Sequence, residues 1–187
     1  MSDLHLGKSG HFRKAGIGIP QDVLKTDLHV LLSQVQYFKP SLLLVVGDMF
    51  HSENNLEHEL FLRWRKDIPQ TKFALVAGNH DILDRTWYKK AGIDIYADSF
   101  SIKEFGFVHD ISKPTGQNYD YHFSGHIHPG IRINGQGKQL VQLPCFYFGA
   151  SHAVLPAFGK FTGTHAIKPE PGDTIFAIAG NKVIRVK

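Results

Sequence analysis

Side chains of the kinds that bind metal ions stand at seven positions, where a short apolar run ends or a compact motif occurs. They are Asp3, His5, Asp48, Asn79, His109, His126 and His128. Asp3 and His5 are separated by one residue, so in extended backbone both side chains leave the same face of the chain. Aspartate, asparagine and histidine supplied by several segments are typical of a metal site, and we expect one to be assembled here.

The mixture of ligand types indicates which ions such a site would hold. Carboxylate, imidazole and amide oxygen together suit Mn²⁺, Fe²⁺ or Zn²⁺ better than Ca²⁺, which prefers shells made only of oxygen. Seven ligands are more than one tetrahedral ion uses. The sequence therefore predicts two ions that share a bridging carboxylate, an arrangement that activates water as hydroxide for in-line displacement at phosphorus.

Two further polar residues adjoin these ligands. His80 follows Asn79 and is not needed as a ligand, so we expect it to protonate the leaving oxygen as a general acid. Asp81 is expected to hold the His80 ring in its orientation, the supporting role that fixes a tautomer. These two residues complete the predicted catalytic set.

The ligands require strands that deliver them to one place. The apolar residues before Asp48 predict a strand at 41–47 that is buried on both faces, and a second strand is predicted at 73–77. In α/β sheets, ligands gather outside the carboxyl ends of the strands. Asp48 therefore stands where chemistry is usually done.

Two amphipathic helices are predicted beside these strands. Apolar residues recur at three- and four-residue steps in 21–38 and in 54–67, which indicates helices with one face against a sheet. The expected apolar stripes are Leu24, Leu28, Leu31, Val35 and Phe38, then Leu56, Leu60, Phe61 and Trp64. Alternating strands and helices favour parallel pairing and an α/β fold. The basic stretch 8–20 is expected to be a loop.

The second half of the sequence consists of short apolar runs between Gly, Pro and Asn residues. A strand is predicted at 102–108, before His109, and another around Phe123, before His126. Further short strands are expected at 131–133, 139–143, 174–179 and 182–186. Gly180-Asn181 between the last two is a hairpin signal. We expect these strands to pair antiparallel and form a second sheet.

Composition describes an ordinary globular protein. The 187 residues suit a single domain, 1–187, with 42% hydrophobic and 20% charged residues. No apolar run is long enough for a membrane helix, and a single cysteine fits a reducing compartment, so we expect a cytoplasmic protein without a membrane partner. The net charge of +4 permits a polyanionic partner such as DNA. Twelve histidines are consistent with metal binding.

In order, the motifs Asp3-x-His5, Gly47-Asp48, Gly78-Asn79-His80-Asp81, His109 and Gly125-His126-x-His128 resemble those of the calcineurin-like metallophosphoesterases. The resemblance implies that one ion is held by Asp3, His5, Asp48 and His128. It implies that the other is held by Asp48, Asn79, His109 and His126, with Asp48 bridging and His80 as the acid. The implied fold is an α/β two-sheet β-sandwich flanked by helices. The strand that leads into Asp3-x-His5 in that family is expected to be shortened here.

A narrower resemblance is to the bacterial DNA-ligase-associated phosphoesterases. It is carried by His5-Leu-Gly-Lys8, Phe12-Arg13, Gly16-Ile-Gly-Ile-Pro20, Gly47-Asp-Met-Phe-His51, Leu143-Pro-Cys-Phe146 and Leu155-Pro-Ala-Phe-Gly159-Lys-Phe-Thr-Gly163. This group implies a Mn²⁺-dependent phosphodiesterase or endonuclease linked to DNA repair. It also implies a DNA ligase, a helicase and an exonuclease as partners.

Substrate contacts are expected from basic residues near the ligands. Lys8 and Arg13, with Lys14, are predicted to contact backbone phosphates, with a solvated basic loop as the equal alternative. His51 follows Asp48 closely enough to reach substrate. Five other histidines are assigned to the surface or the core: His11, His29, His58, His152 and His165.

The sequence thus predicts a hydrolase with two divalent metal ions that cleaves phosphodiester bonds, in DNA above all, by means of a metal-activated hydroxide and His80. Mn²⁺ is the ion favoured by the resemblance, with Fe²⁺ and Zn²⁺ as alternatives. Two other functions remain open: a phosphomonoesterase or small-nucleotide hydrolase that uses the same ions, and a non-catalytic metal-binding scaffold in a DNA repair assembly.

Overall fold

Helices and short strands alternate through the first half of the chain, and strands dominate the second half. The computed structural model describes residues 1–14, 16–18, 22–51, 56–113, 119–135, 137 and 139–187. In chain order the elements are α1 (Lys8–Lys14), α2 (Asp22–Phe38), β1 (Leu42–Val46), α3 (Leu56–Arg65), β2 (Lys72–Val76), α4 (Arg85–Ala91), β3 (Ile93–Tyr96), β4 (Ser99–Ile102), β5 (Phe105–Val108), β6 (Tyr121–Ser124), β7 (Pro129–Asn134), β8 (Leu140–Phe148), β9 (His152–Val154), β10 (His165–Ala166), β11 (Thr174–Ala179) and β12 (Lys182–Arg185).

The first sheet is parallel, as the alternation of strands and helices predicts. Its order is β1-β2-β3, and both β1–β2 and β2–β3 are parallel pairs. Neither β3 nor α4 before it was predicted. The signals for α4 are visible in the sequence, because Asp84 caps its first turn by accepting a hydrogen bond from Thr86 and Gly92 ends it in the left-handed conformation.

The second sheet is mixed rather than antiparallel. It runs β10-β7-β8-β9-β6-β5-β4, and β11 joins β8 and carries β12. The prediction of antiparallel pairing is correct for β7–β8, β8–β11 and the β11–β12 hairpin, but β6 is parallel to both β5 and β9. The strand predicted at 102–108 is in fact two strands, β4 and β5, because the chain turns at Lys103, where φ is +54°.

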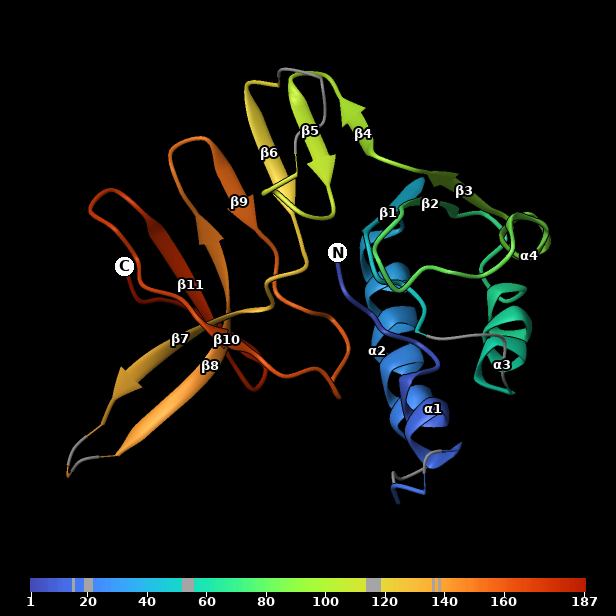
Figure 1. Cartoon of the computed structure of the whole chain (residues 1–187), viewed down its shortest axis with the longest axis horizontal. Helices are drawn as coiled ribbons and strands as arrows, with labels where there is room; N and C mark the ends of the chain where they lie inside the picture. Colours follow the sequence, from blue (N-terminus) through green and yellow to red (C-terminus); the bar gives the residue numbers. More distant parts are fainter. Residues whose placement is uncertain (15, 19–21, 52–55, 114–118, 136, 138) are drawn as a thin grey trace.

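The segment Met1–Leu6 lies between the two sheets (Figure 1). On one side it bonds to β1 and the residues that follow, with Val46 N donating to Met1 O (2.8 Å) and Asp3 N to Gly47 O (3.0 Å). On the other side Phe158 N donates to Ser2 O (3.0 Å). The helices α1 to α4 of the described residues lie on the side of the first sheet in Figure 1. The segment predicted to carry two ligands is therefore held by backbone bonds on both sides.

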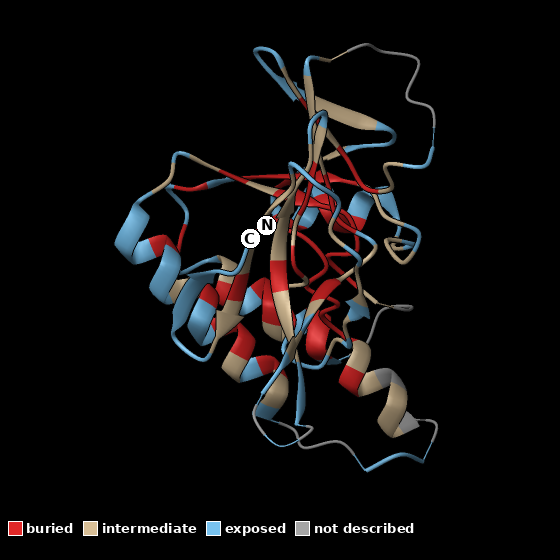
Figure 2. Cartoon of the chain, turned by 90° about the vertical axis from the view of Figure 1, so that its left-hand side faces the viewer, coloured by how far each residue is buried: buried red, intermediate tan, exposed pale blue. Residues whose placement is uncertain are grey.

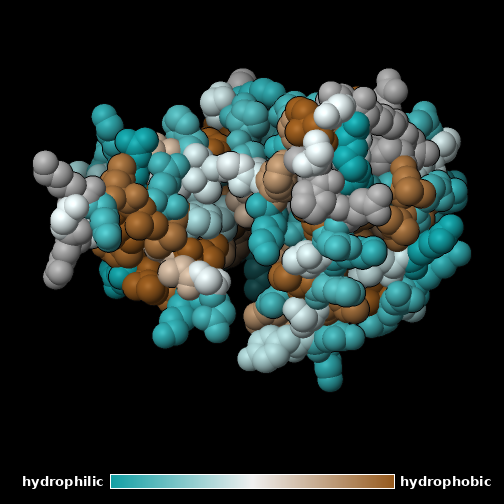
Figure 3. All heavy atoms as spheres, turned by 90° about the horizontal axis from the view of Figure 1, so that it is seen from below, coloured by the Kyte–Doolittle hydropathy of each residue, from teal (hydrophilic) through white to brown (hydrophobic). Residues whose placement is uncertain are grey.

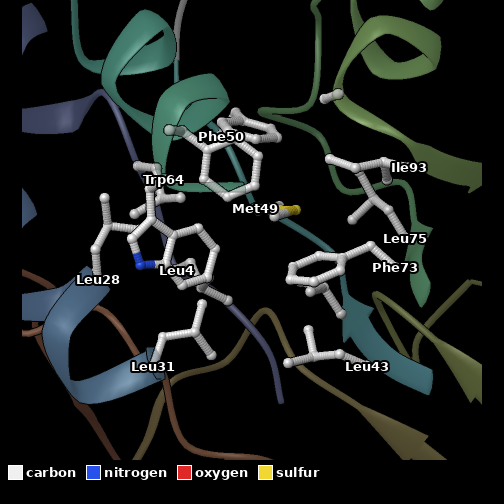
Figure 4. Close-up of a cluster of buried hydrophobic side chains, with 14 of the residues drawn as sticks. Leu4, Leu28, Leu31, Leu43, Met49, Phe50, Trp64, Phe73, Leu75 and Ile93 are labelled. Carbon is white, nitrogen blue, oxygen red and sulfur yellow. The ribbon is translucent and has the colours of Figure 1, made fainter. Parts of the chain in front are cut away.

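The main core lies between the first sheet and its helices. Figure 4 shows Leu28 and Leu31 of α2 facing Leu43, Phe73 and Leu75 of the strands. Buried residues gather in the middle of the molecule, and the outer faces of the helices are exposed (Figure 2). Most of the predicted apolar positions are buried or packed against this core. The predictions for Phe38 and Leu56 are wrong, since they are 68% and 75% exposed at helix ends.

The basic stretch predicted as a loop at 8–20 begins with α1, so that expectation is wrong for Lys8–Lys14; residues 15 and 19–21 lie outside the described residues. The helix predicted at 54–67 is α3, and Asn54 likewise lies outside them. Figure 3 shows apolar side chains gathered at the end where β7 and β8 lie, where Leu140 and Val141 are exposed. Among the described residues, no helix has both the length and the apolar character needed to cross a membrane.

Candidate metal centre

Asp3, His5 and His128 form the first cluster of candidate ligands, with one donor atom from each within 4.8 Å of the others. His128 Nε2 is 3.3 Å from Asp3 Oδ1 and 3.4 Å from His5 Nε2. Asp3 and His5 are buried, whereas His128 is half-buried. The amino-terminal segment and the loop after β6 therefore converge, although they are far apart in the sequence.

Asp48, His109 and His126 form the second cluster. His109 Nε2 lies 3.4 Å from Asp48 Oδ2 and 3.1 Å from His126 Nδ1. Asn79 joins this group, because its Oδ1 is 3.2 Å from His109 Nε2. Asp48 and His109 are buried, and His126 and Asn79 are exposed.

Asp48 lies between the two clusters. Its Oδ2 is 3.4 Å from His109 Nε2 in the second cluster and 3.9 Å from His5 Nε2 in the first. Its other oxygen, Oδ1, accepts a hydrogen bond from the His80 backbone N–H (2.9 Å). One carboxylate oxygen is thus placed to contact both clusters, which the sequence analysis expected of Asp48. All seven predicted ligands are brought together.

The second cluster is assembled because parallel strands end side by side. Asp48 and Asn79 follow β1 and β2, which are parallel neighbours, and His109 follows β5, the parallel neighbour of β6. His109 Nδ1 lies 3.4 Å from the Val46 carbonyl oxygen. A carbonyl oxygen only accepts hydrogen bonds, so Nδ1 carries the proton in this contact, and Nε2 is left to bind an ion when the ring is neutral.

The backbone at these ligands is in an unusual conformation. Five candidates have positive φ angles: Asp3 (53°), His5 (49°), Asp48 (48°), His126 (67°) and His128 (51°). Each such residue costs free energy of order 1–3 kcal/mol, although Asp and His tolerate the left-handed region better than most side chains. Backbone strain of this kind gathers at functional sites, where the surrounding structure enforces it.

Three glycines allow the ligands to approach one another. A Cβ on Gly78 would lie 2.1 Å from Asp48 Oδ1, and a Cβ on Gly47 would lie 1.8 Å from His109 Nδ1. On Gly125 it would lie 2.5 Å from Asp3 Oδ2. Each distance is far below van der Waals contact, so any side chain at these positions would displace a candidate ligand.

Asp81 supports the loop of Asp48 and not the ring of His80. Its carboxylate accepts hydrogen bonds from the backbone N–H groups of Phe50 (2.9 Å), Gly78 (2.9 Å) and Met49 (3.3 Å). The sequence analysis expected it to orient the His80 ring, whereas the observed bonds tie the loop after β1 to the loop after β2. Burial, the largest cause, raises the pKa of Asp81 to about 6 against the effect of these bonds.

The environment shifts the pKa values of the two buried histidines in opposite directions. Burial lowers the pKa of His5 to about 3, even though Asp48 opposes the shift, so His5 is neutral and able to act as a ligand. Burial is the largest single effect on the pKa of His109 and lowers it, but the hydrogen bond and charge of Asp48, with smaller contributions from Asp3 and the Val46 carbonyl, together raise the pKa above its ordinary value. Burial raises the pKa of Asp48, and its contacts with His109, the His80 N–H and His5 more than reverse this, to about 2.

The donor set fits divalent cations. In the second cluster, His109 Nε2 faces two oxygen acceptors, Asn79 Oδ1 at 3.2 Å and Asp48 Oδ2 at 3.4 Å. In the first cluster, His5 Nε2 faces His128 Nε2. Acceptors that face one another need a proton or a cation between them. The raised pKa of His109 shows the same demand for positive charge. Imidazole combined with carboxylate and amide oxygen suits Mn²⁺, Fe²⁺ or Zn²⁺.

The predicted catalytic and substrate-binding residues lie at different distances from the clusters. The His80 ring stacks on His51, with centroids 4.3 Å apart, and both rings are edge-on to His5 at 5.4 and 5.5 Å. Lys8 begins α1 directly after this segment and is partly buried, and burial lowers its pKa. Arg13 instead pairs with buried Glu57 (2.6 Å), a contact that joins α1 to α3.

Sequence reasoning missed the residues that position the ligands. The Val46 carbonyl behind His109 could not be found, because a backbone contact between β1 and the end of β5 leaves no mark on residue types. The glycines offered a clearer signal, since each stands inside a ligand motif. Their role could not be assigned from the sequence, because it depends on which atoms lie beside the Cα of each glycine in the folded chain.

Comparison with known proteins gives two findings. The family model for calcineurin-like phosphoesterases matches residues 1–114. Among solved structures, the whole chain superposes on 86% of the Pseudomonas putida nuclease MPE crystal structure, with a TM-score of 0.80 and 23% sequence identity. No curated protein sequence matches this chain.

Proposed function

The chain belongs to the calcineurin-like phosphoesterase family, and from this premise we propose that it hydrolyses phosphodiester bonds with two divalent metal ions. Asp3, His5 and His128 would hold one ion, and Asn79, His109 and His126 the other. The observation that carries the proposal is the position of Asp48 Oδ2, 3.4 Å from His109 Nε2 and 3.9 Å from His5 Nε2. One carboxylate shared by two ligand sets is what a pair of adjacent ions requires.

The residues around the two clusters have distinct roles in this proposal. Bound ions of this kind supply Lewis-acid polarisation of a phosphoryl oxygen and water of lowered pKa. The His80 imidazole, which lies beside His5, would donate a proton to the leaving oxygen. His51, stacked on His80, and Lys8 would bind the non-bridging oxygens of the phosphate. Asp81 keeps the two ligand loops in register through three backbone bonds.

DNA is the proposed substrate and Mn²⁺ the proposed metal. The net charge of +4 and the likeness in fold to a nuclease support a nucleic acid substrate. The motifs shared with DNA-ligase-associated phosphoesterases support a role in DNA repair beside a ligase, a helicase and an exonuclease. Arg13 would contribute less to DNA binding than expected, because Glu57 already engages its guanidinium.

A substrate panel tests the reaction class. We expect Mn²⁺-loaded protein to hydrolyse bis(p-nitrophenyl) phosphate faster than p-nitrophenyl phosphate and to nick plasmid DNA. Faster hydrolysis of the monoester, with no nicking, would favour a phosphomonoesterase. Protein that holds no metal and cleaves neither ester would be a scaffold.

Two variants test the assigned roles. Asp48→Asn removes the shared charge, so turnover should be abolished and metal content should fall below two ions per chain. His80→Ala should slow turnover by about 10²–10⁴-fold, the usual contribution of a general acid, with metal content unchanged. His29→Ala, at an exposed histidine on α2, is the matched control and should match the wild type. Full activity in either site variant would contradict its role.

A further inference from the structure

A groove of about 830 Å³ begins at His126, on the outer side of the second cluster. Its volume falls in the range of small-molecule binding sites. The groove is lined by His126, Ile127, Tyr147, His152, Val154, His165, Ala166, Ile167, Lys168 and Glu170. The proposed function uses only His126 of this set, so the remaining residues form a surface without an assigned task.

The second sheet builds the groove beside the ligand loop. Tyr147 of β8 pairs with Val154 of β9, so both side chains lie on one face of the sheet, and the rings of Tyr147 and His152 are 5.5 Å apart. On the opposite wall, His165 N donates to the His128 carbonyl (2.8 Å). This bond ties the wall to the loop that carries two candidate ligands. A group bound in the groove would therefore lie next to the metal centre.

The lining is neutral and has aromatic, apolar and hydrogen-bonding parts. Ile127, Val154 and Ile167 are apolar, and the charges of Lys168 and Glu170 balance. Burial and the Asp173 carboxylate raise the pKa of the Tyr147 phenol, which keeps this ring uncharged at neutral pH. A flat heterocycle with apolar faces and polar edges fits such a lining, whereas a second phosphate would find only one ammonium group.

A second recess beside the centre has different chemistry. It adjoins Asn79 and His109, measures about 270 Å³ and is lined by Asp98, Asp110 and Lys113. Two carboxylates against one ammonium make this side unfavourable for a nucleotide. The two sides of the centre are therefore distinguished by charge and by aromatic content.

We propose that the groove binds the base of the nucleotide whose phosphate is cleaved, with the base stacked on Tyr147 and His152. This inference rests on the proposed function and narrows its substrate to esters that carry a nucleoside on the His126 side. Stacking on an aromatic side chain is worth about 1–3 kcal/mol per base, equivalent to roughly 5- to 150-fold in affinity.

Titration calorimetry of the Mn²⁺-loaded protein tests the groove separately from the metal centre. Inorganic phosphate probes the centre alone, whereas deoxyadenosine 5′- and 3′-monophosphates probe the centre together with the groove. We expect one of the two nucleotides to bind about 5- to 100-fold more tightly than phosphate. Equal affinity for phosphate and both nucleotides would overturn the groove proposal and leave the phosphoesterase proposal standing.

Substitutions show whether the extra affinity comes from the groove. Tyr147→Ala and His152→Ala should each reduce the nucleotide-to-phosphate ratio, whereas Tyr147→Phe, which keeps the ring, should retain most of it. Tyr37→Ala, at an exposed tyrosine of α2, is the control. Phosphate binding in each variant confirms that the protein is folded. A ratio that survives both Tyr147→Ala and His152→Ala would overturn the assignment. Binding of neither phosphate nor nucleotide by the wild type would overturn the proposed function as well.

Discussion

The ligands are held in place by what surrounds them and not by their own preferred conformations. Asp48 has positive φ, a buried carboxylate and a hydrogen bond from the His80 backbone. Gly78 lies against the same carboxylate, with no room for a side chain. Removing this close fit should therefore affect metal binding before it affects folding.

Gly78→Ala tests this fit. The new Cβ would lie 2.1 Å from Asp48 Oδ1 and 2.4 Å from the Asp48 backbone nitrogen, so the carboxylate and the loop that carries it must shift. We expect metal content to fall and turnover to drop by about 100-fold, since small displacements at a reacting centre have effects of that size. Metal analysis and steady-state kinetics provide the measurement.

Gly18→Ala is the control for this change, because a Cβ there meets nothing within 4 Å. Neither glycine has positive φ, so the two substitutions differ in their neighbours and not in backbone strain. Two bound ions and normal turnover in Gly78→Ala would show that the close approach is not needed.

Residue types and motif spacing picked out the seven candidate ligands that the structure brings together, because metal-ligand chemistry restricts which side chains can serve. The same reasoning failed for Asp81. A carboxylate next to His80 in the sequence suggested a contact with its ring, but the three backbone N–H groups that it binds come from two loops that meet only in the folded chain. Partners of this kind depend on tertiary structure.

Among the elements, the amino-terminal segment is decisive because it carries two ligands without belonging to a regular strand. The segment bonds to the residues after β1 on one side and to Phe158 and Gly159 on the other. The loop that contains Gly159 is therefore part of the support of the first cluster, although it holds no ligand itself.

Gly159→Ala should weaken the first cluster selectively. A Cβ at this position would lie 2.4 Å from the Leu4 carbonyl oxygen, so the segment that carries Asp3 and His5 must shift. We expect the protein to bind about one ion per chain and to lose most activity, because, among the described backbone hydrogen bonds, this loop is joined to Ser2 and Asp3 and not to Asp48, Asn79 or His109. Gly163→Ala, in the same loop and with nothing within 4 Å, should bind both ions. The measurement is the number of metal ions bound per chain. Equal numbers in Gly159→Ala and Gly163→Ala would contradict the claim that this loop supports the first cluster selectively.

The bond between α2 and this loop is sensitive to pH. Asp27 of α2 accepts a hydrogen bond from Lys160 N (3.3 Å), and burial raises its pKa above 3.8. A raised folded-state pKa means that the stability contributed by protonated Asp27 is present below pH 3.8 and is lost as pH rises through the folded pKa. An asparagine side chain at this position cannot ionise and keeps an acceptor for the Lys160 N–H.

Asp27→Asn should therefore raise the melting temperature at about pH 7 and have little effect at about pH 3.5. Lys8, Glu57 and His5 line the same small cavity as Asp27 and also titrate. The quantity to compare is therefore the difference in melting temperature between the wild type and Asp27→Asn at each pH. Thermal unfolding over this range provides it. A difference that is constant or reversed in sign would contradict the shifted pKa.

The elements with strong periodicity were predicted well, and those set by local turns were not. Residues 22–38 and 42–46 show clear apolar patterns over their length. By contrast, α1 has a mixed, glycine-containing sequence, and the run at 102–108 concealed the turn at Lys103. The parallel neighbours of β6 could not be predicted, because strand order depends on contacts distant in the sequence.

At the scale of the whole molecule, the two candidate ligand clusters lie where the two sheets meet. Its ligands come from the amino-terminal segment, the loops after β1 and β2 of the first sheet, and the loops after β5 and β6 of the second. An ion that binds only the folded chain stabilises it by about 2.7 kcal/mol at 100 times its dissociation constant. Metal binding should therefore raise the free energy of unfolding of the whole protein.

Removal of Mn²⁺ with a chelator should lower the melting temperature by about 5–10 °C, given the usual 2–4 °C per kcal/mol for a chain of this size. Restoring Mn²⁺ should reverse the change. Asp48→Asn, which lacks the shared charge, should show a much smaller response. An equal response in Asp48→Asn would place the stabilising ion elsewhere.

The central claim is that two ions sit side by side, bridged by Asp48. Anomalous diffraction at the manganese absorption edge, from crystals grown with Mn²⁺, tests it directly. The account predicts two peaks on either side of the Asp48 carboxylate, one within bonding distance of Asp3, His5 and His128 and the other of Asn79, His109 and His126. A single peak, or peaks away from these residues, would contradict it.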